Sequence, residues 1–137
     1  MKAVAHALQL HASGLRLELV LVNVQEPASF YEMVTLHDKA ALDKLAQDAG
    51  ADTLAPAVRL VQDAGVPCVQ AVLVGDPVPM LLEACEEHAC QAIVMGSHGK
   101  GAVRSVLLGS VSRAMLGSAQ VPVTLVKPDE GEDTEGV

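Results

Sequence analysis

Apolar residues recur along this chain in two alternating patterns, one with the period of a helix and one typical of buried strands. Residues 2–13 place their apolar side chains on one helical face, and Gly14 is a suitable helix stop. Residues 15–24 alternate and then become continuously apolar, as a strand buried in a parallel sheet does. We therefore expect the sequence to open with a helix and a strand.

The next segment predicts a loop and a long helical region. Residues 25–34 have the composition of a loop, and residues 35–64 have a helical pattern. Gly50 and Pro56 interrupt this pattern, and proline removes a backbone donor from a helix interior. We therefore expect two helical pieces or a kink.

Three more strands and two more helices follow in alternation. The strands are expected at residues 66–74, 91–95 and 121–127, and the helices at residues 77–88 and 109–118. Asp76 can cap the first of these helices, with Pro77 in its first turn. Four strands alternating with helices indicate an α/β domain, built as an open, mostly parallel twisted sheet with helices on both faces.

Composition and charge narrow the choice of partners. The chain has 137 residues, half of them hydrophobic, with one Tyr, one Phe and no Trp, so its core is built from Ala, Val and Leu. Nine basic residues against seventeen acidic ones give a net charge of −8, so we expect no nucleic-acid or membrane partner. Residues 1–127 read as one domain, and residues 128–137 as an acidic disordered tail.

Cysteine and histidine usage indicates a reducing compartment and no metal. The three cysteines form no C-x-x-C pair, and their odd number argues against a disulfide framework. The five histidines show no metal-ligand spacing. No apolar run is long enough to span a membrane, and no secretory signal is visible. We therefore expect a cytoplasmic protein.

Residues 95–112, MGSHGKGAVRSVLLGSVS, are rich in glycine and serine and lie between an expected strand and an expected helix. Two familiar phosphate motifs do not fit this stretch. A P-loop requires Ser or Thr where Gly101 stands. A dinucleotide fingerprint that begins at Gly99 meets Arg104 where Gly or Ala is required.

The arrangement nevertheless has the physical features of a phosphate site. Glycines at the carboxyl end of a strand let backbone N–H groups converge on an anion. The first N–H groups of the following helix, those of Ser110, Val111 and Ser112, lack partners within the helix and favour negative charge. Side-chain donors are added by the hydroxyls of Ser97, Ser110 and Ser112, and Lys100 or Arg104 can reach the outer phosphates. The alternative interpretation is a flexible connection with Ser110 as an ordinary helix cap.

The spacing of this stretch resembles the universal stress protein pattern G-x-x-G-(nine residues)-G-[ST], without a mismatch. The matching residues are Gly96, Gly99, Gly109 and Ser110. The resemblance extends to VGDP (74–77), IVMGSHG (93–99) and VPVTLVK (121–127), and it covers residues 1–127. It implies a five-stranded parallel sheet in the order 3-2-1-4-5, with ATP at the carboxyl ends of the strands.

The resemblance also implies the residues that bind the nucleotide. The assigned positions are Val24, Met95, Gly96, Ser97, His98, Gly99, Lys100, Gly109, Ser110, Val111 and Ser112. Val24 is assigned to the adenine, and the glycine-rich stretch to the ribose and phosphates, with Mg²⁺ as an accompanying ion. A homodimer is implied through the last strand, from Val121 to Lys127, paired antiparallel across a two-fold axis.

One feature departs from the family. Its usual first strand is the central one and ends in a turn whose Asp binds the adenosine part. Met1 aligns within the helix that follows this strand. We therefore expect a sheet that lacks its first central strand in the given sequence. Either the true start lies upstream of Met1, or something else fills the gap, most simply a direct pairing of the neighbouring strands.

The function implied by the resemblance is ATP binding by a regulatory protein of the stress response. Binding is favoured over turnover, because no acidic residue accompanies the glycine-rich stretch to hold Mg²⁺ or orient water. Two alternatives stay open: a dimeric regulatory module that has lost nucleotide binding, and a slow ATPase.

Overall fold

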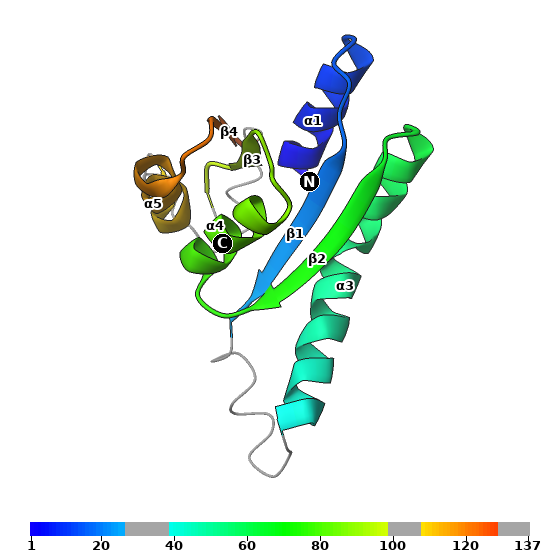
Figure 1. Ribbon diagram of the computed structural model, residues 1–137. Coiled ribbons are helices and arrows are strands. Elements are labelled where there is room, and N and C mark those ends of the chain that lie inside the picture. The colour runs from blue at the N-terminus through cyan, green and yellow to red at the C-terminus, as the bar shows by residue number, and fades with distance from the viewer. Residues whose placement is uncertain (27–38, 99–107, 129–137) are drawn as a thin grey trace. The chain divides into compact units, whose positions relative to one another are not determined.

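A computed structural model of the chain describes residues 1–26, 39–98 and 108–128 and divides it into two compact units. We call Arg16–His88 the continuous unit, and Met1–Leu15 with Ala89–Val137 the split unit. Each unit contains one pair of parallel strands with packed helices (Figure 1). The expected α/β class with parallel strands is confirmed.

The continuous unit is built on strands β1 (Leu19–Gln25) and β2 (Cys68–Val74). They pair in parallel from Leu19 with Cys68 to Gln25 with Val74. Helix α3 (Lys39–Asp63) lies between them in sequence, and helix α4 (Pro77–Glu87) follows β2. Both helices pack against the strand pair, which gives the strand–helix alternation that the apolar pattern predicts.

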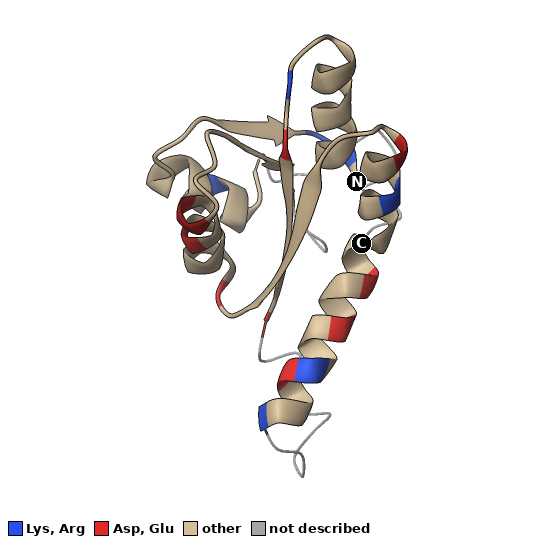
Figure 2. Cartoon of the chain, turned by 45° about the vertical axis from the view of Figure 1, so that its right-hand side comes forward, with Lys and Arg blue, Asp and Glu red and all other residues tan. Residues whose placement is uncertain are grey.

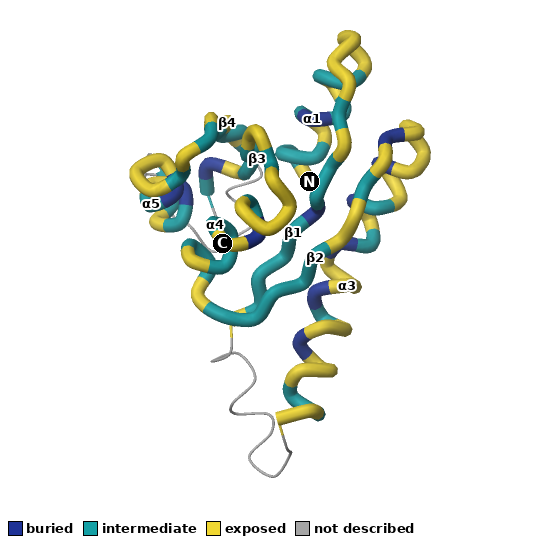
Figure 3. The backbone as a smooth tube through the Cα atoms, viewed as in Figure 1, coloured by how far each residue is buried: buried dark blue, intermediate teal, exposed yellow. Residues whose placement is uncertain are grey.

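Helix α3 is a single helix, so the first of the two expectations, two helical pieces divided at Gly50 and Pro56, is wrong, and the kink stays a prediction. Pro56 lies inside the helix and removes one backbone donor from it. The buried positions of α3 form one stripe from Ala46 to Val61, and Figure 3 shows this stripe on the side that faces the strands. Burial of a continuous apolar face outweighs one missing hydrogen bond.

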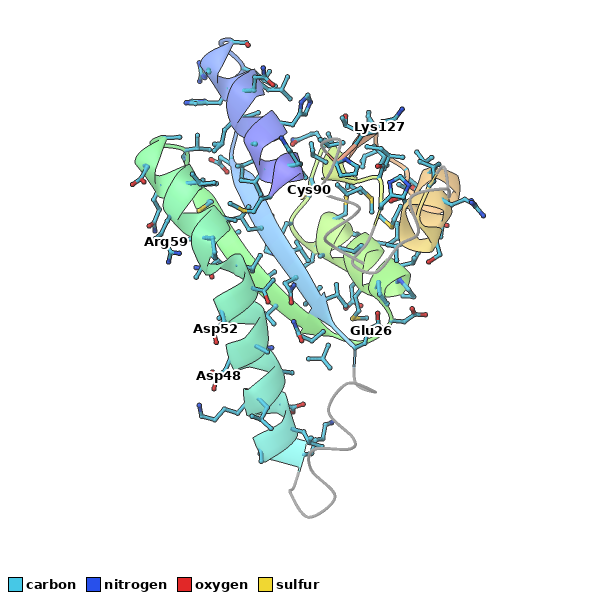
Figure 4. All side chains as sticks on the ribbon, turned by 180° about the vertical axis from the view of Figure 1, so that it is seen from behind. Glu26, Asp48, Asp52, Arg59, Cys90 and Lys127 are labelled. Atoms are coloured by element: carbon cyan, nitrogen blue, oxygen red, sulfur yellow. The ribbon has the colours of Figure 1, made fainter. Side chains whose placement is uncertain are left out.

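The opposite side of α3 is polar. Asp48, Asp52 and Arg59 point away from β1 and β2 in Figure 4, and Lys44 forms an exposed ion pair with Asp48 at 3.0 Å. Acidic positions are spread along α3 and gathered on α4 (Figure 2). The helix is therefore amphipathic, with its charged face in water.

The split unit contains strands β3 (Ile93–Gly96) and β4 (Val123–Val126), which pair in parallel. Helix α1 (Lys2–Ala12) packs against both strands, and helix α5 (Ser110–Ser118) packs against β4. Gly14 follows α1 with a φ of +110°, which confirms it as the helix stop.

The described residues form one two-stranded sheet in each unit, and the expected direct pairing of the neighbouring strands stays a prediction. Backbone groups of alternate residues point to opposite edges of a strand. Ile93 and Ser97 donate to β4 and the residue before it, so Val94 and Gly96 present the other edge of β3. The Gly96 carbonyl on that edge accepts a hydrogen bond from the Ser112 hydroxyl at 2.8 Å.

Candidate functional site

The candidate site begins where β3 ends, at Gly96. The Ser97 N–H donates to the Val126 carbonyl at 2.9 Å, which continues the ladder one residue beyond the strand. The Ser97 carbonyl accepts the Gly109 N–H at 2.8 Å. The carboxyl end of β3 is therefore joined directly to the residue that precedes helix α5.

Helix α5 starts with a glycine cap. Gly109 is the N-cap, with φ −66° and ψ 160°, and no side chain of the described residues caps this helix start. Arg113 makes the first hydrogen bond of the helix: its N–H donates to the Gly109 carbonyl at 3.0 Å. The interpretation of Ser110 as an ordinary N-cap is wrong, because Ser110 is the first helical residue.

Because the cap of α5 is a glycine, no cap side chain occupies the first backbone N–H groups of this helix. A serine in that place would direct its oxygen to the N–H of the second or third helical residue. With Gly109 there, the N–H groups of Ser110, Val111 and Ser112 have no acceptor within the helix. Their dipoles add to that of the helix, whose amino end favours negative charge.

The serine side chains at the site are placed in two different ways. Ser110 is exposed at the helix start. Ser112 is 2% exposed, and its hydroxyl donates to the Gly96 carbonyl at 2.8 Å. Ser97 is 1% exposed, and its Oγ lies 2.8 Å from Nδ1 of His98, so Ser110 is the one exposed residue of these three serines.

The other assigned residues lie at different places. Met95 is partly buried on β3, next to Gly96. Val24 is partly buried on β1 and belongs to the continuous unit. Gly99 and Lys100 lie outside the described residues. The residues that the structure brings together are Gly96, Ser97, His98, Gly109 and Ser112.

Sequence reasoning missed that Ser112 is used within the fold. It assigned the Ser112 hydroxyl to the phosphates, whereas the hydroxyl donates to a backbone carbonyl sixteen residues earlier. Such a contact leaves no periodic signal, because it depends on how a strand end and a helix start are brought together.

Two further findings concern the described part of the chain. Its helices include none that is both long and apolar enough to cross a bilayer. Its His, Cys, Asp and Glu side chains nowhere gather three or more together in an arrangement that could hold a metal ion.

Comparison with known proteins gives a consistent result. The model of the universal stress protein family matches residues 1–127. Universal stress protein MJ0531 of Methanocaldococcus jannaschii is 26% identical over 132 residues, which cover 96% of this chain and 77% of that protein. Universal stress protein Rv2005c of Mycobacterium tuberculosis is 33% identical over 116 residues, which cover 85% of this chain and 38% of that longer protein.

Solved structures show the same fold. The structure of MJ0577, a hypothetical protein in its own description, superposes with a TM-score of 0.77 at 23% identity and covers 93% of this chain and 86% of that one. Universal stress protein UspA from Lactobacillus plantarum has a TM-score of 0.66 at 20% identity, with 90% and 86% covered.

Proposed function

This chain belongs to the universal stress protein family, and we propose that it is a stress-response regulatory protein that binds ATP through the start of helix α5. The observation that carries the proposal is the glycine-capped helix start. There the N–H groups of Ser110, Val111 and Ser112 have no acceptor within the helix. The fold joins this start to the carboxyl end of a parallel strand, through the bond between Gly109 and Ser97.

The physical chemistry of this helix start suits a polyphosphate. Each hydrogen bond to a charged oxygen contributes about 1.5–3 kcal/mol. A helix amino end adds about 0.3–1 kcal/mol for a negative charge. Three backbone donors and the exposed Ser110 residue thus suit the binding of a triphosphate at micromolar strength, which corresponds to about 8 kcal/mol.

The proposal assigns Val24 to the adenine and the remaining assigned residues to the ribose and phosphates. ATP binds with or without Mg²⁺, and the assigned residues include no carboxylate to hold the ion or orient water. The protein therefore binds ATP as a signal and does not turn it over at an appreciable rate. A measured phosphate release above background would instead favour the slow ATPase.

Localisation and assembly complete the proposal. The protein works in a reducing compartment such as the cytoplasm, consistent with three free cysteines. It forms a homodimer through the outer edge of β4, where the backbone groups of Val123 and Leu125 point away from β3. The outer edge of β2 suits this role less well, because Gln47 of α3 donates to its Val72 carbonyl at 3.0 Å.

Calorimetric titration of two matched serine variants tests the phosphate site. Ser110 and Ser118 are exposed serines at opposite ends of α5. We expect Ser110→Ala to weaken ATP about 10- to 100-fold, the equivalent of one charge-assisted donor, and to leave adenosine binding unchanged. Ser118→Ala should leave both ligands unchanged. An equal loss for ATP and adenosine, or an equal effect of both variants, would show that the helix start is not a phosphate site.

A further inference from the structure

The Ser112 hydroxyl is enclosed within the fold. The residue lies in the first turn of α5, is 2% exposed, and donates to the Gly96 carbonyl at 2.8 Å. A serine hydroxyl has a single proton to donate. This hydroxyl therefore cannot donate to a phosphate without releasing the carbonyl.

The carbonyl that it binds has a particular place in the sheet. Ser97 and Ile93 direct their N–H groups toward β4, so the backbone groups of Gly96 between them point to the opposite edge of β3. Within the split unit, no other described strand pairs along that edge. The side chain of Ser112 takes the place that a strand donor would otherwise have.

A second bond joins the same two segments. The Gly109 N–H donates to the Ser97 carbonyl at 2.8 Å, next to the carbonyl that Ser112 binds. The consecutive carbonyls of Gly96 and Ser97 thus bind Ser112, the third residue of α5, and Gly109, its N-cap. Helix α5 also packs against β4, and these two bonds add a direct restraint on the direction of its first-turn N–H groups.

We propose that Ser112 is a positioning residue of the phosphate site and that its side chain does not bind the ligand. Its hydroxyl holds the start of α5 against β3, so that the backbone N–H groups of Ser110, Val111 and Ser112 converge on the phosphates. Ser110, which is exposed, is then the side-chain donor of this turn. This inference rests on the proposed function and deepens it.

The test measures the hydrogen bond and the affinity in the same full-length variants. The carbonyl ¹³C chemical shift of Gly96 reports whether its oxygen accepts a hydrogen bond. Calorimetry gives the affinities for ATP and for inorganic tripolyphosphate. The variants are Ser112→Ala, which removes the donor, and Ser112→Thr and Ser112→Cys, which keep one. Met115→Ala is the matched control, because Met115 is fully buried in the same helix.

We expect Ser112→Ala to move the Gly96 shift upfield and to weaken ATP and tripolyphosphate by the same factor, about 3- to 10-fold. Whichever of Ser112→Thr and Ser112→Cys keeps the wild-type Gly96 shift should also keep the wild-type affinity. Met115→Ala should lower the melting temperature and leave the affinity unchanged well below that temperature.

Three results would overturn the inference while leaving the proposed function in place. The first is a Ser112→Ala variant with an altered Gly96 shift and unaltered affinity. The second is an equal loss of affinity in Met115→Ala. The third is a wild-type protein in which ATP itself moves the Gly96 shift upfield, because the hydroxyl would then leave the carbonyl for the ligand. A wild-type protein that binds neither ATP nor tripolyphosphate would overturn the proposed function, and this inference with it.

Discussion

Single residues decide where the helices of this protein end. Gly14 after α1, Gly65 after α3 and Ala89 after α4 all have positive φ, at +110°, +73° and +51°. After α3, the Gly65 N–H donates to the Gln62 carbonyl at 2.9 Å and the Val66 N–H to the Val61 carbonyl at 3.2 Å. This pair of bonds turns the chain out of the helix and requires a left-handed residue.

Ala89 is the one described residue other than glycine with positive φ, so its replacement by glycine should stabilise the protein. We expect Ala89→Gly to raise the free energy of unfolding by about 0.5–1 kcal/mol, because a left-handed alanine is strained. Gly65→Ala is the reverse substitution at a position of the same kind and serves as the control. A Cβ at Gly65 meets nothing within 4 Å, so backbone strain alone should lower the free energy of unfolding, by about 1 kcal/mol. Urea unfolding measures both, and a change of the same sign in both variants would contradict this account.

The residue scale also shows which details a sequence can predict. Gly14 is recognisable as a helix stop because it directly follows the helical apolar pattern, where glycine is the usual residue that ends a helix. Ala89 occupies the same kind of position and carries no such signal, because alanine favours the helix interior. The hydroxyl of Ser112 is likewise assigned correctly only when its partner, Gly96, is known.

At the scale of elements, the close approach of α3 to the strands depends on Gly50. The residue is buried in the middle of the helix, and a Cβ built there would collide with Cγ1 of Val72 and lie 2.9 Å from its Cγ2. It would also lie 3.1 Å from Oδ1 of Asn23 on the neighbouring strand. Glycine therefore serves helix–sheet packing here, and its helix-breaking tendency is overridden.

A pair of glycine-to-alanine variants separates packing from helix propensity. We expect Gly50→Ala to lower the free energy of unfolding by about 1–3 kcal/mol, because Val72 is stiff and must move. Gly117→Ala in α5 should raise it by about 0.5–1 kcal/mol, because a Cβ there meets nothing within 4 Å and alanine favours the helix. Thermal and urea unfolding report both changes. A stabilising Gly50→Ala would mean that α3 does not pack closely on β2.

Elements were predictable where one periodicity dominates. The expected strand at residues 66–74 and helix at residues 77–88 match β2 and α4 to within two residues. The break in α3 was predicted wrongly because local propensity was weighed without the buried stripe that crosses it. The pairing of strands could not be predicted from periodicity, which describes each strand alone.

At the scale of the whole molecule, the proposed homodimer depends on the outer edge of β4. Because Ile93 donates to the Pro122 carbonyl and Ser97 to the Val126 carbonyl, the backbone groups of Thr124 point toward β3. Those of Leu125 point outward. An edge strand tolerates proline where its N–H faces away from the sheet, so Leu125→Pro removes one intermolecular donor and leaves the internal ladder intact.

We expect Leu125→Pro to shift the protein from dimer to monomer in analytical ultracentrifugation at micromolar concentration. Leu125→Ala controls for the lost side chain and should stay largely dimeric. Thr124→Pro should lower the melting temperature, because it removes a donor directed toward β3. A wild-type protein that sediments as a monomer, or a Leu125→Pro variant that remains a dimer, would rule out assembly through this edge.

The fold class and the family were predictable because they depend on long-range features of the sequence. Alternating strands and helices specify the class, and four spaced residues, Gly96, Gly99, Gly109 and Ser110, specify the family. The strand pairing within each unit was not predictable, because it depends on contacts between strands that are far apart in the sequence.

The central claim is that the start of α5 binds the phosphates of ATP, and backbone amide shifts test it most directly. The ¹⁵N-labelled full-length protein is titrated with ATP, with inorganic tripolyphosphate and with adenosine. We predict that ATP and tripolyphosphate produce their largest amide shifts at Ser110, Val111 and Ser112, and that adenosine leaves these three unmoved. The claim is contradicted if saturating ATP leaves the three amides in place, or if adenosine moves them as far as ATP does.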